Sequence, residues 1–171
     1  TASSRIPLKI YNHTVQNLLE RCAEPLDLIS GLYDGVCQQD FLNYAWKTLM
    51  QNHPHDSICG CSRDEIHAHM EDHYQAIREV TDELLRRGMI LAAQHNAAAV
   101  SYPEEYSLVA VNTLGVPQNG MIEAELIFPA EDKVDGFAIY DSEGKEVEFS
   151  LISREKGPMD VFSPINLPGI I

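Results

Sequence analysis

The apolar residues in the first hundred positions recur at helical spacing. In three stretches, residues 14–30, 38–50 and 64–94, they fall three or four residues apart, as expected when one face of a helix packs on a core. The second stretch is predicted to bury its apolar side, which consists of Phe41, Tyr44, Ala45, Leu49 and Met50. Three helices of this length are typical of a bundle. The pattern therefore predicts a three-helix domain over residues 1–100.

Proline, glycine and serine positions predict where these helices bend, stop and start. Pro25 lies inside the first stretch, where it removes a backbone donor and crowds the preceding turn, so a kink or an early end is expected. Gly31 is expected to stop that helix. Ser62 is followed three residues later by Glu65, which is the spacing of a capping box, so Ser62 is predicted to cap the third helix.

After Tyr102-Pro103 the pattern changes from helix to strand. Four short runs are rich in β-branched and aromatic residues and partly alternate, and turn sequences such as GVPQNG separate them. Four strands alone would leave apolar faces or edges uncovered, so we expect the sheet to continue beyond Ile171. The predicted fold class is α+β by segments: a three-helix bundle, then an incomplete, sandwich-like antiparallel β segment over residues 101–171.

Charge and composition exclude several classes of partner. The chain carries 12 basic and 26 acidic residues, a net charge of −14, which repels phosphate backbones and anionic lipid, so neither nucleic acid nor a membrane surface is expected to bind. No apolar run approaches the roughly 18–20 residues of a spanning helix. The four cysteines are too few and too irregular for a disulfide scaffold, which favours a reducing, cytoplasmic setting. A start without methionine suggests a segment of a longer protein.

The richest chemistry lies in residues 51–65, QNHPHDSICGCSRDE. Pro54 stiffens the backbone between His53 and His55, which helps to aim one imidazole, but two histidines in an extended stretch point in alternating directions. A zinc site needs three or four ligands, and this stretch alone could supply only one or two. The alternative interpretation of the stretch is a polar loop without a metal. Cys59 and Cys61 have the wrong spacing for a redox pair or a structural zinc pair. The glycine between them is expected to allow a sharp turn.

A second group of histidines, His67, His69 and His73, lies on the third predicted helix. His69 and His73 are one turn apart and could chelate a metal, although the glutamate that a zincin motif requires is missing. Solvated or half-buried helix histidines are the simpler interpretation. No carboxylate pair, nucleophile elbow or phosphate loop stands out, so the residues alone indicate only a helical bundle, a β segment and one stiff loop with a histidine and an aspartate.

Residues 46–66, WKTLMQNHPHDSICGCSRDEI, resemble a signature of glycoside hydrolase family 38, the α-mannosidases, in its bacterial form. The flanking sequences agree with this resemblance. SSRIPLKIYNHTVQNLLERCAEPL is similar to the start of the three-helix middle domain of the family, and SLVAVNTLGVPQNGMIEAELIFP is similar to the start of its C-terminal β domain.

The resemblance implies a zinc-dependent, retaining hydrolysis of terminal α-mannosyl residues. In that family most zinc ligands and the nucleophile lie in an N-terminal α/β domain, and one histidine ligand comes from the middle domain. Carried onto this sequence, the ligand is His55, and Asp56 would bind a substrate hydroxyl. Pro54 replaces the neighbouring histidine of the family motif, so no role is assigned there.

The implied partners are an α-mannoside, the N-terminal α/β catalytic domain of the same protein and the rest of its β domain. The segment itself is expected to hold no catalytic residue and to be inactive alone. Two alternatives stay open. One is a non-catalytic helical interaction module, and the other is an independent metal-binding domain built on His67, His69 and His73.

Overall fold

The computed structural model describes residues 4–96, 106–128 and 134–155. The chain falls into two compact units, Thr1–Asn119 and Gly120–Ile171, which are described separately. The boundary predicted between residues 100 and 101 lies outside the described residues.

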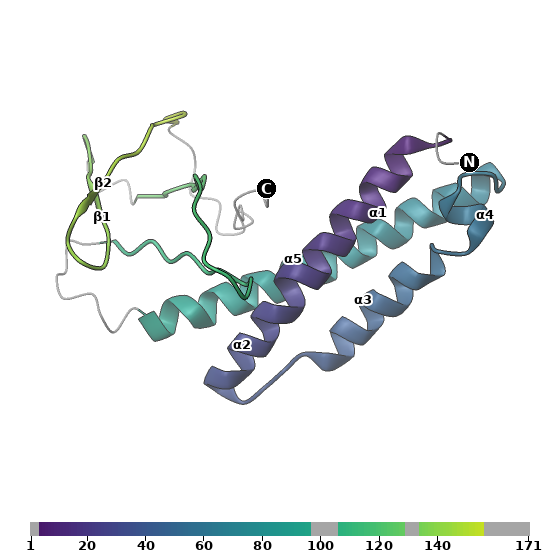
Figure 1. The fold of residues 1–171 in the computed structure, drawn as a ribbon, viewed down its shortest axis with the longest axis horizontal. Helices are drawn as coiled ribbons and strands as arrows, with labels where there is room; N and C mark the ends of the chain where they lie inside the picture. Colours follow the sequence, from purple (N-terminus) through teal and green to yellow (C-terminus); the bar gives the residue numbers. More distant parts are fainter. Residues whose placement is uncertain (1–3, 97–105, 129–133, 156–171) are drawn as a thin grey trace. The chain divides into compact units, whose positions relative to one another are not determined.

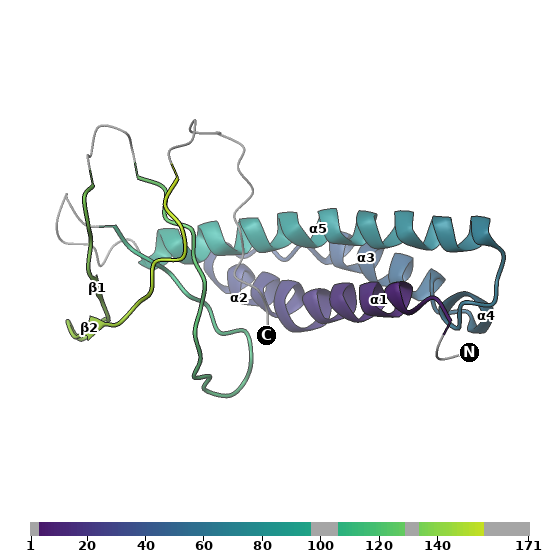
Figure 2. The same cartoon turned by 90° about the horizontal axis from the view of Figure 1, so that it is seen from above.

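The first unit is a bundle of three long helical rods, as the spacing of apolar residues predicts (Figure 1). The longest rod, α5, contacts each of the others, and Figure 2 shows α1, α2 and α3 running along it. The helices of this unit are α1 (Ile6–Leu18), a π-helical turn (Leu19–Ala23), α2 (Glu24–Asp34), α3 (Gln39–Gln51), the short α4 (His55–Ile58) and α5 (Asp64–Asn96).

The core of the bundle follows α5. Its buried apolar residues are spaced mostly three, four or seven positions apart, so they form one stripe on which the other helices bury their own stripes. These residues are Met70, Tyr74, Ile77, Leu84, Leu85 and Ala92 on α5, Leu42, Ala45 and Leu49 on α3, and Leu8, Val15, Leu19, Ala23 and Leu26 along α1 and α2.

The predicted buried side of α3 is wrong for Phe41, Tyr44 and Met50, each of which is more than half exposed. Leu42, Ala45, Thr48 and Leu49 are buried instead. They are spaced three and four residues apart, whereas the aromatic residues precede Leu42 and Ala45 by one position and are therefore turned by about 100° around the helix. The apolar band of α3 is thus wider than the face that the bundle covers.

Pro25 distorts its helix without ending it. The residues just before it form the π-helical turn Leu19–Ala23, and the chain stays helical from Ile6 to Asp34. A proline lacks the amide that an α-helix would donate to the carbonyl four residues earlier, here that of Arg21. The hydroxyl of Thr113 donates a hydrogen bond to this carbonyl at 2.6 Å. A residue 92 positions from Arg21 thus bonds to the carbonyl that the proline deprives of its α-helical partner.

Two predicted helix boundaries are corrected. Gly31 does not stop α2, which ends at Gly35 with a left-handed φ of 76°. The lack of a side chain at Gly31 serves packing instead, because a Cβ there would overlap the Sγ of Cys37. Ser62 does not cap α5 either. The carbonyl of Arg63 accepts the first helical bonds, while the amide of Ser62 is engaged by the loop before it.

The second unit contains the antiparallel pair β1 (Ile139–Tyr140) and β2 (Glu146–Val147), with Ile139 opposite Val147. The carboxylate of Asp141 accepts hydrogen bonds from two amides of the turn at 2.9 Å, and the ring of Phe137 stacks on that of Phe149. Helices followed by an incomplete antiparallel segment are confirmed. In the described part of the chain, the two earlier runs that were expected to be strands show no strand pairing.

The described residues include no helix long and apolar enough to cross a membrane. They do include one unusual buried group, His67, near the start of α5. Its side chain is 3% exposed, and neither ring nitrogen has a hydrogen-bond partner among the described residues. A buried polar group without a partner has lost its hydration without compensation, so His67 is expected to destabilise the bundle.

We therefore expect the variant His67→Leu to raise the free energy of unfolding by about 1–2 kcal/mol, measured by urea denaturation. The matched control is His69→Leu, on the exposed side of the same helix, which accounts for the better helix propensity of leucine and should change stability by less than about 0.5 kcal/mol. A loss of stability in His67→Leu would show that the imidazole makes a stabilising contact.

Candidate functional site

The loop between α3 and α5 carries the predicted site residues. We call residues 53–62 the His55 loop. Its second residue, Pro54, has a φ of −50° and a ψ of 141°, so the chain leaves α3 extended and then enters the single helical turn of α4. The amides of Cys61 and Ser62 both donate to the carbonyl of Asp56 at 3.1 Å, so the loop closes on itself. A loop closed in this way presents its outer side chains from a defined backbone.

His55 and Asp56 are neighbours on the outer side of this loop. Their side chains are 85% and 72% exposed, and His55 Nδ1 lies 3.1 Å from Asp56 Oδ1. A carboxylate only accepts, so Nδ1 is the donor of this bond, and in the neutral imidazole the lone pair of Nε2 is then left for a ligand bond. This pairing of an imidazole with a carboxylate is the usual arrangement of a metal-binding histidine and its supporting partner.

The carboxylate of Asp56 is kept ionised by its neighbours. Its hydrogen bond with His55, followed in size by that with Cys61, lowers the pKa of Asp56 below its ordinary value. The Sγ of Cys61 lies 3.5 Å from the same Oδ1. An ionised, exposed carboxylate is a strong hydrogen-bond acceptor, so Asp56 can orient the imidazole and still accept a bond from a hydroxyl group.

The described residues do not complete a metal site by themselves. They contain no group of three or more histidine, cysteine, aspartate or glutamate side chains placed to hold an ion. Zinc takes three or four protein ligands, so the donor chemistry of His55 fits one position of such a site and the other positions need residues from elsewhere. The assignments of His55 as ligand and Asp56 as substrate-binding residue stay predictions.

The other histidines are directed elsewhere. His53 bonds to Asn12 on α1 at 2.8 Å, on the bundle side of the loop, in line with the alternating directions expected around Pro54. His67 is buried, His69 is exposed, and His73 bonds to Asn52 at 2.8 Å. In the described part of the chain these three histidines of α5 therefore form no metal cluster. This geometry does not support the alternative of an independent metal-binding domain built on them.

Asn52, the residue that caps the C-terminus of α3, is a functional candidate that the sequence did not single out. Its side chain is fully buried and bonds to α5 twice. A signal for it exists in the sequence, because Asn52 continues the three- and four-residue spacing of Leu42, Ala45 and Leu49. A polar residue on an apolar stripe is buried, and a buried amide needs partners.

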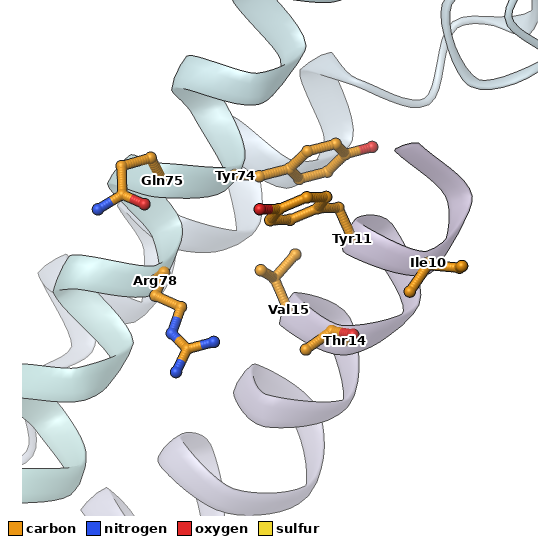
Figure 3. Close-up of a pocket in the computed structure, with 7 residues that line it drawn as sticks. All are labelled: Ile10, Tyr11, Thr14, Val15, Tyr74, Gln75 and Arg78. Atoms are coloured by element: carbon orange, nitrogen blue, oxygen red, sulfur yellow. The ribbon is translucent and has the colours of Figure 1, made fainter. Parts of the chain in front are cut away.

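A shallow groove of about 130 Å³ lies between α1 and α5 (Figure 3). Tyr11 and Tyr74 line it, and their rings stack with centroids 6.1 Å apart. Gln75 and Arg78, which also line it, are paired along α5, with Glu79 and Asp82 respectively. The groove therefore presents no acid and base that face each other, and the His55 loop is the better candidate for chemistry.

Comparison with known proteins identifies the helical unit. Residues 1–92 match the family model described as the α-mannosidase middle domain, which is more than half of the chain. The chain belongs to glycoside hydrolase family 38. A putative mannosylglycerate hydrolase from Halalkalibacterium halodurans is 40% identical over 116 residues, which are 67% of this chain and 13% of that protein.

Two solved structures from Enterococcus faecalis are similar to this family 38 chain. One is a protein of glycosyl hydrolase family 38, with 43% identity and a TM-score of 0.52 over 53% of this chain and 11% of the other. The second is an α-mannosidase of strain V583, with 42% identity and a TM-score of 0.53 over 54% of this chain and 10% of the other. The matched part of the chain thus covers only 10–13% of the length of these relatives.

Gly60 allows a test of how the loop is seated on the bundle. It has a φ of 79°, and a Cβ there would lie 3.1 Å from the carbonyl oxygen of Ser4. We expect Gly60→Ala to lower the free energy of unfolding by about 2–3 kcal/mol, from backbone strain and from displacement of the N-terminal segment.

The control for this prediction is Gly35→Ala. Gly35 has nearly the same φ, 76°, but no described heavy atom lies within 4 Å of its Cβ position, so strain alone should cost about 1 kcal/mol. Urea denaturation of both variants measures the difference. Equal losses would show that Ser4 does not pack against the loop.

Proposed function

We propose that this chain contributes one zinc ligand, His55, and one substrate-binding carboxylate, Asp56, to the active site of a zinc-dependent α-mannosidase. The reaction is the retaining hydrolysis of terminal α-mannosyl residues. Membership of family 38 supports a hydrolase as the parent protein. The observation that carries the finer proposal is the exposed pair of His55 and Asp56, because the carboxylate holds the imidazole in the tautomer that ligates through Nε2.

Two residues of this chain have different proposed roles, one in binding the metal and the other in binding the sugar. His55 holds the metal, and Asp56 orients His55 while its remaining lone pairs accept a bond from a sugar hydroxyl. When bound, zinc would polarise and orient the sugar hydroxyls that it contacts. The nucleophile and the general acid lie outside this segment, so the segment alone is proposed to be inactive. Its partners are then the N-terminal α/β catalytic domain and the rest of the β domain of the same cytoplasmic protein.

Mannosylglycerate is one substrate to test, since the relative from Halalkalibacterium halodurans is named as a putative hydrolase of it. Aryl α-mannosides test the broader activity. The similar proteins include both a putative mannosylglycerate hydrolase and an α-mannosidase, so the proposed substrates are α-mannosides as a class.

A non-catalytic interaction module is the second candidate. The observation in its favour is that large apolar side chains on the outside of α1 and α2 are exposed, including Ile10, Leu28 and Leu32. Surfaces of this kind fit either an external partner or the other domains of a large glycosidase. The exposed apolar side chains are therefore expected for both the mannosidase segment and the interaction module. Only a role of His55 in metal binding distinguishes the two.

The deciding experiment compares wild-type full-length protein with His55→Ala. We expect the variant to lose stoichiometric zinc, measured by elemental analysis, and to lose more than about 100-fold in kcat/KM for an aryl α-mannoside, because loss of a ligand should cost more than loss of a supporting residue. Chelation of the wild type should abolish activity, and added zinc should restore it.

His69→Ala is the matched control, because it removes an exposed histidine from the same domain outside the His55 loop. It should keep both zinc and activity. If His55→Ala also keeps both, the loop is no part of a metal site, and the interaction module becomes the better account of the chain.

A further inference from the structure

The base of the His55 loop is fixed by five polar side chains, which we call the Asn52 network: Asn12, Asn52, His53, His73 and Tyr74. Asn12 comes from α1, and His73 and Tyr74 come from α5. Asn52 and His53 are the two residues that directly follow α3. The network therefore lies where all three rods of the bundle meet the start of the loop.

Asn52 forms the first connection. Its Nδ2 donates to the carbonyl of Met70 at 3.0 Å, and its Oδ1 accepts from His73 Nδ1 at 2.8 Å. Both ends of a fully buried amide are thus used, so the side chain cannot rotate without losing a buried hydrogen bond. The residue at which the chain leaves α3 is thereby held to α5.

Asn12 forms the second connection. Its Oδ1 accepts from His53 Nε2 at 2.8 Å and from the hydroxyl of Tyr74 at 3.3 Å. Burial raises the pKa of Tyr74 to about 12, so this hydroxyl keeps its proton at any ordinary pH. The residue after Asn52 is thereby held to α1, and through the same oxygen to α5.

The position of His55 depends on these connections. Its imidazole is exposed and bonds only to the neighbouring Asp56 among the described residues, so no contact of its own side chain with the bundle holds it in place. Pro54 has a restricted φ and follows directly after the held residues Asn52 and His53. At the far end of the loop, the hydroxyl of Ser4 donates to the carbonyl of Gly60 at 3.0 Å.

An apolar residue at position 52 would continue the stripe of α3 and would serve stability alone. A fully paired buried amide instead specifies one arrangement of the helices. We infer that Asn52 and His73 are positioning residues, which hold the His55 loop in the orientation that the proposed zinc site requires. This inference rests on the proposed function, and a supporting network of this kind is what a precise ligand geometry needs.

The test compares His73→Leu, which removes the donor to Asn52, with His73→Asn, which can place an amide N–H near the position of Nδ1. In the full-length protein we expect His73→Leu to lower zinc affinity and kcat for an aryl α-mannoside by about tenfold or more. His73→Asn should recover most of both. His69→Leu, an exposed histidine of the same helix, should leave both unchanged.

A merely structural role would lower the melting temperature of His73→Leu and leave kcat and zinc affinity of the folded protein at wild-type values. Ile77→Val, one turn further along the core of α5, provides a variant destabilised without any effect on the network. If His73→Leu and Ile77→Val behave alike in kcat and in zinc affinity, the positioning role is refuted.

Hydrogen exchange keeps the inference testable independently of catalysis. The amides of Cys61 and Ser62, which bond to Asp56, should exchange at least about tenfold faster in His73→Leu than in His69→Leu. Unchanged exchange would overturn the positioning role even if the enzyme is a mannosidase. Faster exchange in a protein whose activity does not depend on His55 would instead refute the proposed function and leave the control of the loop by His73 standing.

Discussion

Burial of one long stripe on α5 determines the arrangement of the helical unit. Every other rod of the bundle contacts this helix. At Gly88 a Cβ would collide with Leu26 of α2, so the absence of a side chain brings α2 and α5 together. Buried hydroxyls of the core donate to carbonyls of their own helices, Thr81 on α5 to that of Ile77 and Ser30 on α2 to that of Leu26. These hydroxyls therefore need no water to complete their hydrogen bonds, whereas the ring nitrogens of His67 have no partner among the described residues.

This packing separates the residues that fix the His55 loop from those that face outward. Asn52 and Tyr74 are buried and belong to the core, whereas His55 and Asp56 are among the exposed side chains. A group that must meet a ligand cannot also be buried in a core, so its position has to come from the backbone that carries it. The extended Pro54, the single turn of α4 and the left-handed Gly60 are the local means by which the fixed ends are joined.

Much of this fold follows from sequence periodicity, because amphipathic spacing depends only on which faces are buried. The three rods, the sharp turn at Gly60 and the disturbance at Pro25 were predictable for this reason. The true end of the helix near Gly31 and the true start of the helix near Ser62 were not predictable, because each depends on a contact made on folding. At Gly31 this is the approach of Cys37, and at Ser62 it is the hydrogen bond from the Ser62 amide to the carbonyl of Asp56. The paired strands β1 and β2 surround a local turn, whereas the other runs expected to be strands need distant partners.

The candidate site shows the same division between local and distant information. Spacing alone indicated a stiff loop with one aimed imidazole, and only the family resemblance distinguished His55 from His53. The geometry supplies a physical reason for that distinction: His53 uses its Nε2 to hold Asn12, whereas the exposed His55 bonds to Asp56 through Nδ1 and does not use its Nε2 in this way. Two histidines on either side of one proline therefore take different tasks. A histidine that ligates a metal in a neighbouring domain depends on a second residue of this kind, because an exposed imidazole is oriented only as accurately as the backbone that carries it is held.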